Sequence, residues 1–412
     1  MGVQGEEKSR EGIGVYIHIP FCASKCPYCD FSSVAVAGLT GPVEIEKGYT
    51  DCVIRELESF ASTGPAPQTR LLQSVYIGGG TPSLFSPQSI ARIIGSVKAA
   101  FTPAPDCEVT IEANPDSIDE AKLDGYLKAG ANRLSIGVQS LDDAELKTLG
   151  RVHTADKAVL AFKSARKAGF ANIGADLIFG IPGQSEARFA SSLSRLIALC
   201  PEHISVYGLT YEEGTPMTAV KEAGGFDGRL PTDEVEEAMY RLAQAMLAEG
   251  GYCHYEVSNW ALPGFESRHN RRYWLGGEYL GLGSGAHSYM RAGTNGGPWG
   301  VRWWNDASIE RYCALIMDTD GEGGSARAFT EKLGRREAMV ESLMLGIRMP
   351  GRGVEGAQFR RAFGLFPAEA FPRCAALISQ GLLRLRGDDL LLTDRGLLLS
   401  DSVFAELLRP DI

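Results

Sequence analysis

Six short runs of β-branched and aromatic residues alternate with longer amphipathic stretches between residues 14 and 207, and this alternation limits the fold more than any other feature. Strand–helix alternation at this spacing predicts βαβ units and a parallel sheet. Six units fit either an open doubly wound sheet or a partial TIM-like barrel. The expected strands are 15–19, 74–77, 108–112, 133–138, 172–178 and 203–207, and the expected helices between them are 45–60, 87–100, 119–129, 154–168 and 186–199.

Residues suited to chemistry occur where the expected strands end. In parallel α/β folds the active site assembles at the carboxyl edge of the strands, because the loops converge there. Five such features on one edge favour the barrel, so we expect an α/β fold with a partial (βα)6 TIM-like barrel over residues 14–250. The features are a cysteine cluster after the first strand, the run 78–82 after the second, Glu112 at the end of the third, Gln139 after the fourth and Asp176 late in the fifth.

Three further segments flank the expected barrel. Residues 1–13 form a polar tail, and 251–330 form a Gly- and Trp-rich extension that indicates loops with short strands. Residues 331–412 have the outline of a winged-helix-like module without a basic face, which favours a structural lid or docking domain over a DNA reader. Its expected helices are 335–348, 356–363, 367–380 and 394–408, and its expected strands are 382–386 and 390–393.

Charge and cysteine content narrow the class of protein. The 412 residues carry a formal net charge of −10, which argues against nucleic acid as the main partner. The first residues lack the apolar core of a secretion signal, and no apolar run is long enough to span a bilayer, so we expect a cytoplasmic protein. Nine cysteines, an odd number without an export signal, indicate a metal or catalytic site rather than a disulfide framework.

Cys22, Cys26 and Cys29 form the one close group of cysteines in the sequence. Thiolates are the usual ligands of iron–sulfur clusters. Three of them can hold three irons of a [4Fe-4S] cluster and leave the fourth iron open to a substrate. A zinc site is the alternative, with His18 as the candidate for the fourth ligand.

The C-x3-C-x2-C spacing, with Tyr28 before the last cysteine, resembles the radical-SAM superfamily. This resemblance implies that the open iron binds the amino and carboxylate groups of S-adenosylmethionine, which is then cleaved to a 5′-deoxyadenosyl radical. A finer match, which continues into the C-terminal module, is to the coproporphyrinogen-oxidase-like radical-SAM proteins. The stretches that carry it are 16–22, 78–82, 112–115, 132–140, 149–153 and 176–184.

The family resemblance implies a set of residues that contact S-adenosylmethionine. The chemistry of the side chains agrees with it, because Arg151 can pair with a carboxylate through two hydrogen bonds and Asp176 or Gln139 can accept from the ribose or the amine. His153 and Gln184 lie in the same stretches and are not assigned. The implied residues are Tyr16, Gly79, Gly80, Thr81, Glu112, Gln139, Arg151 and Asp176.

Two positions separate the branches of this family. The decarboxylating coproporphyrinogen III oxidases carry a further cysteine where this chain has Phe31, whereas the HemW-type heme chaperones resemble this chain there and in the stretch His-Asn-x-x-Tyr-Trp. The resemblance to the chaperones implies heme as a ligand, with His269 as its axial ligand and His287 as the second candidate. Arg271 and Arg272 could pair with the heme propionates.

The resemblance to heme chaperones also sets the expected partners. They are heme, heme-accepting proteins and an electron donor for the cluster. Transient docking to membrane heme proteins and a homodimer stay open. The alternatives are an oxygen-independent coproporphyrinogen III oxidase and a radical-SAM enzyme with some other substrate, so the sequence leaves open whether the chain catalyses a reaction.

Overall fold

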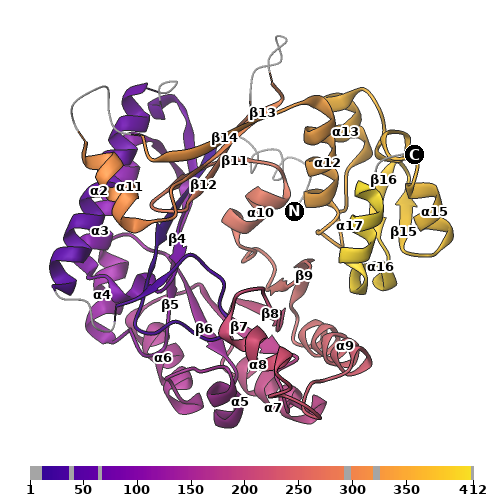
Figure 1. The fold of residues 1–412 in the computed structure, drawn as a ribbon, viewed down its shortest axis with the longest axis horizontal. Helices are drawn as coiled ribbons and strands as arrows, with labels where there is room; N and C mark the ends of the chain where they lie inside the picture. The colour runs from indigo at the N-terminus through magenta and orange to yellow at the C-terminus, as the bar shows by residue number, and fades with distance from the viewer. Residues whose placement is uncertain (1–11, 37–40, 64–66, 292–297, 319–324, 410–412) are drawn as a thin grey trace.

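The computed structural model describes residues 12–36, 41–63, 67–291, 298–318 and 325–409. The six expected strands pair in parallel in chain order, with helices around the outside of a barrel that does not close (Figure 1). The predicted partial barrel is confirmed. Its strands are β1 (Ile13–Ile19), β4 (Leu71–Gly79), β5 (Thr102–Ala113), β6 (Arg133–Gln139), β7 (Ile173–Phe179) and β8 (His203–Gly208). Its helices are α2 (Pro42–Thr63), α3 (Pro87–Ala100), α4 (Glu120–Lys128), α5 (Asp143–Thr148), α6 (Ala155–Ala168), α7 (Glu186–Ile197), α8 (Pro216–Glu222) and α9 (Asp233–Glu249).

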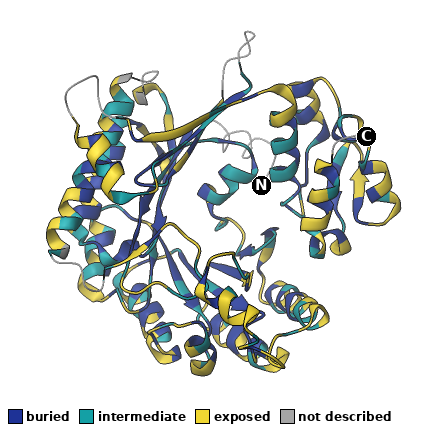
Figure 2. Cartoon of the chain, in the orientation of Figure 1, coloured by how far each residue is buried: buried dark blue, intermediate teal, exposed yellow. Residues whose placement is uncertain are grey.

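Side-chain alternation along the strands separates the core from the barrel interior. In β1 the odd-numbered side chains from Ile13 to Ile19 are fully buried beneath the helices. Tyr16 and His18 face the other way, because successive strand residues point to opposite faces of the sheet. The barrel strands are accordingly mostly dark blue in Figure 2, while the outer faces of the helices are exposed.

The extension continues the barrel sheet at both edges. At one edge β10 (Asn259–Ala261) pairs with β8 and then with β9 (Cys253–Glu256). At the other edge β11 (Glu278–Leu282) pairs in parallel with β1, and β12 (His287–Arg291), β13 (Gly300–Asn305) and β14 (Arg327–Leu333) follow in antiparallel order. The result is a twelve-stranded sheet. The strands of the predicted extension, β9 to β14, therefore belong to the same sheet as the barrel strands.

A buried carboxylate joins the extension to the barrel. Glu56 of α2 accepts hydrogen bonds from the backbone N of Gly283 (2.8 Å), the Nδ2 of Asn305 (2.6 Å) and the hydroxyl of Tyr312 (2.7 Å). Gly283 follows β11, Asn305 ends β13, and Tyr312 lies in α11 (Ile309–Met317). One side chain thus fixes the ends of two added strands and the helix that covers them.

The C-terminal domain has the expected hairpin, and its helices lie in the expected stretches, but two of the four expected helices are divided. The expected single helix 367–380 is wrong, because Pro372 cannot continue a helix and forces Phe371 out of helical geometry. The expected helix 394–408 is also divided, at Leu399. The elements are α12 (Arg335–Gly346), α13 (Gly356–Phe363), α14 (Pro367–Ala370), α15 (Cys374–Ser379), β15 (Leu383–Arg386), β16 (Asp389–Leu392), α16 (Asp394–Leu398) and α17 (Ser400–Leu408).

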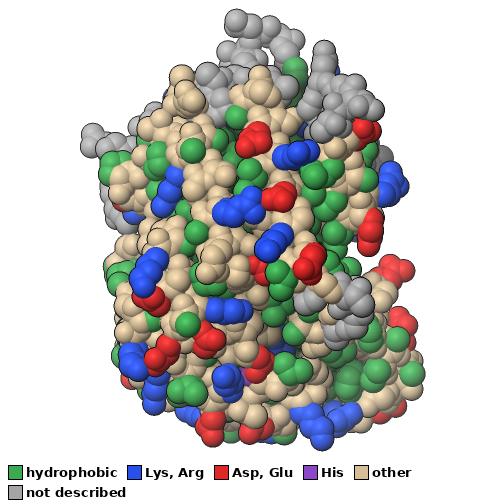
Figure 3. Space-filling view, turned by 90° about the vertical axis from the view of Figure 1, so that its left-hand side faces the viewer, with side chains coloured by type: hydrophobic (Ala, Val, Ile, Leu, Met, Phe, Trp, Pro, Cys, Tyr) green, Lys and Arg blue, Asp and Glu red, His purple; other side chains and the backbone are tan. Residues whose placement is uncertain are grey.

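Among the residues that the structure describes, none of the helices has the length and apolar character needed to cross a bilayer. On the face in Figure 3, basic and acidic side chains are interspersed, without a large patch of one sign.

The Glu56 contacts predict how stability depends on pH. Burial raises the pKa of Glu56 from 4.5 to about 7. Between these values the unfolded chain releases the proton while the folded chain keeps it, so stability falls as the pH rises, by about 3 kcal/mol in all. We expect Glu56→Gln to abolish this decrease. The measurement is the difference between the free energies of unfolding by urea at about pH 5 and at about pH 8.

The matched control is Glu58→Gln, an exposed carboxyl on the same helix, which is expected to keep the wild-type pH dependence. An unchanged pH dependence in Glu56→Gln would contradict this account of the Glu56 contacts.

Candidate functional site

The cysteine loop leaves β1 at the carboxyl edge of the barrel. Its base is fixed by the short parallel pair β2 (Phe21–Cys22) and β3 (Val34–Ala35). Within the loop the backbone N of Cys29 donates to the carbonyl of Cys26 (3.1 Å), and the Nζ of Lys25 donates to the carbonyl of Phe31 (3.0 Å). These bonds hold three thiols on one short, closed loop.

The geometry does not favour the zinc alternative. The Nδ1 of His18 is hydrogen-bonded to the hydroxyl of Tyr16 (3.0 Å) and its Nε2 to the carbonyl of Ser32 (2.7 Å), so both ring nitrogens have partners. In the described part of the chain, no three Cys, His, Asp or Glu side chains are grouped to hold a single metal ion.

The glycine run packs directly against the cysteine loop. Gly80 and Thr81 donate their backbone N–H groups to the carbonyls of Ile19 (2.8 Å) and Phe21 (2.7 Å). A Cβ on Gly80 would lie 2.7 Å from the Phe21 carbonyl oxygen and 3.0 Å from the Cys22 Sγ. Glycine is therefore required here for the close approach of two backbones.

Two buried carboxyl groups face the same interior. Burial raises the pKa of Glu112 to about 7, with a further increase from Asp176, although the hydroxyl of Tyr76 and the backbone N of Gly79 donate to it. Burial likewise raises the pKa of Asp176 to about 6, against the stabilising effects of Ser205 and two arginines. Two carboxyls that ionise reluctantly favour a cationic ligand, which would restore their charged forms.

Arg151 connects the cysteine loop to the strand ends. Its Nη1 lies 3.5 Å from the Sγ of Cys26, and its Nη2 donates to the side-chain oxygen of Asn114 (3.0 Å) and the carbonyl of Gly137 (3.1 Å). Its Nε is buried without a hydrogen-bond partner in the described structure. Nearby Gln139 has a φ of +66°, a left-handed conformation that non-glycine residues seldom adopt.

One cavity of about 380 Å³ gathers most of the predicted site residues. Tyr16 lies behind it, with its ring stacked 6.2 Å from that of Tyr76, and His269 is also outside the lining. The site residues in the lining are Cys22, Cys26, Cys29, Gly79, Gly80, Thr81, Glu112, Gln139, Arg151 and Asp176.

The lining of the cavity also contains polar residues that the sequence analysis missed. Arg133 of β6 and His203, Ser205 and Tyr207 of β8 line it. The Nε2 of His203 is bonded to the hydroxyl of Tyr255 (2.7 Å), and its Nδ1 is buried without a partner in the described structure. The available signal was the alternation of polar residues at 203, 205 and 207, which predicts one polar face turned toward the barrel interior.

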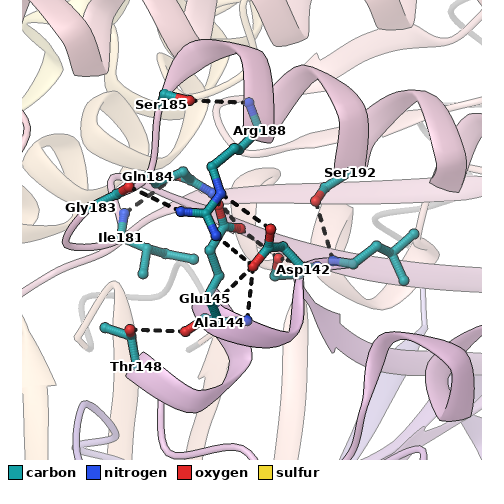
Figure 4. Close-up of polar contacts among 12 residues, drawn as sticks. Asp142, Ala144, Glu145, Thr148, Ile181, Gly183, Gln184, Ser185, Arg188 and Ser192 are labelled. Carbon is teal, nitrogen blue, oxygen red and sulfur yellow. Dashed lines mark hydrogen bonds and ion pairs between the residues drawn. The ribbon is translucent and has the colours of Figure 1, made fainter.

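Gln184 and His153 belong to the support of the site. Gln184 donates to the buried Glu145 (3.0 Å), which also accepts from Ser140 (2.6 Å), while Arg188 pairs with Asp142 (2.8 Å) (Figure 4). The Nε2 of His153 is bonded to the carbonyl of Val138 (3.0 Å). These contacts hold the loops that follow β6 and β7.

His269 lies in a helix rather than the expected loop. Ser267 caps α10 (Arg268–Trp274) by accepting from the backbone N of Asn270, which stabilises the first turn. The His269 ring is 1% exposed, with Nδ1 bonded to Ser74 (2.9 Å) and Nε2 to Tyr273 (2.9 Å). Heme ligation by His269 stays a prediction, and it would require one of these bonds to break.

The two neighbouring arginines differ in burial. Arg272 is 2% exposed, and its Nη1 donates to the carbonyl of Gly12 (3.0 Å), so its side chain is bound in the protein interior. Arg271 is half-buried. Arg272 could pair with a propionate only if its hydrogen bond to Gly12 broke.

The side chains present fit a [4Fe-4S] cluster and S-adenosylmethionine. Cys22, Cys26 and Cys29 supply the thiolates, and the unpartnered Nε of Arg151 and the carboxyls of Glu112 and Asp176 supply complementary charge in one cavity. When bound, such a cluster supplies an electron for reductive cleavage of the sulfonium. The residues of the cavity lining would orient the ligand.

This fold and this donor set define a radical-SAM protein. The family model of the Radical SAM superfamily matches residues 16–196, and the model of the HemN C-terminal domain matches residues 333–399. The chain is 36% identical to "Heme chaperone HemW" of Mycobacterium tuberculosis over 96% of this chain and 94% of that one. It is 34% identical to the protein of the same name from Bacillus subtilis, over 95% and 98%. The chain belongs to the family of these proteins.

A solved structure has the same fold over the full chain. Coproporphyrinogen III oxidase (HemN) of Escherichia coli, a radical-SAM enzyme, matches with a TM-score of 0.77 and 22% identity over 99% of this chain and 93% of that one. At this identity the likeness concerns the fold alone, including the C-terminal module.

The contact between Gly80 and the cysteine loop predicts a defect in cluster assembly. We expect Gly80→Ala to lose most of its iron after anaerobic reconstitution, because the added Cβ displaces the loop that carries Cys22. Iron and sulfide analysis and charge-transfer absorbance measure the loading. The control is Gly95→Ala in α3, where a Cβ meets no atom within 4 Å and helix propensity improves by up to about 1 kcal/mol. Equal loading of the two variants would contradict the role of Gly80.

Proposed function

We propose that the protein is a radical-SAM heme chaperone, which binds a [4Fe-4S] cluster, S-adenosylmethionine and heme and delivers heme to acceptor proteins. The observation that carries this proposal is the identity of residue 31, which is phenylalanine. Phe31 lines the mouth of the cavity with its side chain 60% exposed, at the position where the decarboxylating branch has a further cysteine. The relatives named heme chaperones support it, because the alignment with them extends over nearly the whole chain.

In this proposal each group of side chains has a separate task. The three cysteines hold the cluster, and Arg151, Glu112 and Asp176 bind and orient S-adenosylmethionine. Gly79, Gly80 and Thr81 offer backbone groups to it, Gln139 accepts from it, and Tyr16 supports the carboxyl of Glu112 through Tyr76. No side chain is assigned a catalytic step.

Coproporphyrinogen III oxidase is the second candidate function. The HemN-type C-terminal domain and the common fold favour it. Phe31 argues against it, because its aromatic ring offers neither a ligand nor a redox-active sulfur.

The remaining partners are part of the same proposal. Delivery requires heme-accepting proteins, and reduction of the cluster requires an electron donor. The cytoplasmic location, transient docking to membrane heme proteins and a homodimer stay predictions.

A heme titration tests the proposal. The protein reconstituted anaerobically with iron and sulfide is expected to bind one heme per chain, followed by its Soret absorbance. Cys200 and Cys253 are exposed and could bind hemin adventitiously, so the variant Cys200→Ser/Cys253→Ser is the control, with unchanged stoichiometry expected. Absence of saturable binding would contradict the chaperone function.

The same preparation tests the second function. After addition of dithionite, S-adenosylmethionine and coproporphyrinogen III, we expect the coproporphyrinogen III to remain unconverted, as measured by chromatography. Accumulation of protoporphyrinogen over many turnovers would show that Phe31 does not prevent decarboxylation and would replace the proposed function with the second one.

A further inference from the structure

Three hydrogen-bond donors converge inside the barrel at Gly174 of β7. A Cβ built on this glycine would lie 3.4 Å from the Nδ1 of His203, 3.5 Å from the Oγ of Ser135 and 3.7 Å from the Nη2 of Arg133. Because glycine has no side chain, the point between these three atoms is left for an atom of another molecule. We call Arg133, Ser135 and His203 the donor cluster.

The donor cluster belongs to the cavity that we assign to the cofactors, but it lies toward the other end of the strands. All three of its residues line that cavity. Arg133 and His203 are the first residues of β6 and β8, whereas the cysteine loop follows the carboxyl end of β1. Ser135 precedes Gln139 by four residues, which at about 3.3 Å per strand residue is roughly 13 Å. A group bound at the donor cluster is therefore separate from the groups bound at the open iron.

The buried ring of His203 presents an N–H group to this point. The hydroxyl of Tyr255 accepts a hydrogen bond from the backbone N–H of Ser267, so its own proton is directed to the Nε2 of His203 (2.7 Å). Burial, with a further effect of Arg133, lowers the pKa of His203 well below its usual value, so the ring is neutral. A neutral imidazole that accepts at Nε2 carries its proton on Nδ1. This Nδ1 is buried without a hydrogen-bond partner in the described structure.

The other two members of the cluster also have donor capacity to spare. The Nη1 of Arg133 donates to the side-chain oxygen of Asn172 (3.1 Å) and to the carbonyl of Phe265 (3.0 Å). Among the described residues, none accepts a hydrogen bond from the Nη2 of Arg133 or is hydrogen-bonded to the Oγ of Ser135. Three donors thus surround one point to which the described chain supplies no acceptor.

The charge of Arg133 is only partly compensated. Its side chain is 2% exposed, and the nearest carboxylate oxygen, on Glu108, is 4.0 Å from its Nη1. Glu108 also accepts from the backbone N–H groups of Arg268 and His269 (3.2 Å each). A buried cation is stable only when it is paired and hydrogen-bonded. A bound anion would complete the compensation.

Two carboxyl groups share the interior with the donor cluster, and both have donors of their own. Glu112 accepts from Tyr76 and from the backbone N of Gly79, and Asp176 accepts from Ser205. Burial raises the pKa of Glu112 to about 7 and that of Asp176 to about 6. The sulfonium and amine of S-adenosylmethionine, which we place beside them, add positive charge. These carboxyls therefore leave the donor cluster to another ligand.

We propose that the donor cluster binds the carboxylate of a small organic acid that occupies the barrel together with S-adenosylmethionine. Three donors with one fixed positive charge select an oxyanion, and a guanidinium group matches the two oxygens of a carboxylate. The cavity of about 380 Å³ limits the remainder of this acid to a small molecule. The inference goes beyond the proposed function, because its ligand is neither heme nor S-adenosylmethionine.

The test is a titration of the reconstituted protein with propionate, followed by NMR of protein labelled with ¹⁵N-histidine. The chain has six histidines, so the spectrum is simple, and His203→Gln identifies the signal of His203. We expect the Nδ1–H signal of His203 to shift saturably with propionate, because this N–H donates to the carboxylate. Chloride at the same ionic strength is expected to leave the signal in place.

Two variants change the donor cluster in different ways. In Gly174→Ala the added methyl lies at ordinary contact distance from its neighbours, so the protein is expected to fold and to lose the propionate shift. Ser135→Ala adds no atom and removes one donor, and we expect roughly tenfold weaker propionate binding. The matched control is Gly48→Ala in α2, where a Cβ meets no atom within 4 Å, and it is expected to titrate as the wild type.

The affinity for S-adenosylmethionine, measured by equilibrium dialysis, separates the two ligands and is expected to stay unchanged in Gly174→Ala and Ser135→Ala. An absent propionate shift in the wild type, or an equal shift in Gly174→Ala, would overturn the inference. Loss of S-adenosylmethionine binding in both variants would also overturn it, by assigning the donor cluster to that cofactor. Failure of the heme titration would leave it in place, because no step of this test uses heme.

Discussion

The attachment of three thiolates to the carboxyl end of β1 is the constraint on which the rest of the site depends. In the proposed site Cys22, Cys26 and Cys29 would hold three corners of a cubane and leave one iron for a ligand, so the ligand would be bound by the neighbouring strand ends. The parallel strands provide these groups because their carboxyl ends converge. Glu112, Arg151 and Asp176 come from separate parts of the chain and reach one cavity.

The same sheet links this cavity to the extension. β11 adds in parallel to β1 and carries three antiparallel strands with it, so the concave side of the barrel continues into an open face. Glu56 fixes the ends of the added strands to α2, and Tyr49 reinforces the joint by donating to the carbonyl of His18 (2.9 Å). The barrel thereby fixes the position of the added strands relative to the cofactor cavity.

Much of the fold was predictable because the signals are local. Short β-branched runs between amphipathic stretches predicted the six barrel strands, and the cysteine spacing and the glycine run predicted the centre of the site. The parallel addition of β11 to β1 was not predictable, since pairing between strands far apart in sequence leaves no local pattern. Helix α10 was missed because it is short and aromatic and its main local signal is the capping residue Ser267. The burial of His269 depends on Ser74 and Tyr273, and the contact with Ser74 is non-local.

The most direct test of the central claim is electron paramagnetic resonance of the reduced, reconstituted protein with and without S-adenosylmethionine. The account predicts a [4Fe-4S] signal whose g values shift when S-adenosylmethionine is added, because its amino and carboxylate groups bind the open iron. A signal unchanged at saturating S-adenosylmethionine, or metal analysis that finds one zinc ion per chain instead of a cluster, would contradict it.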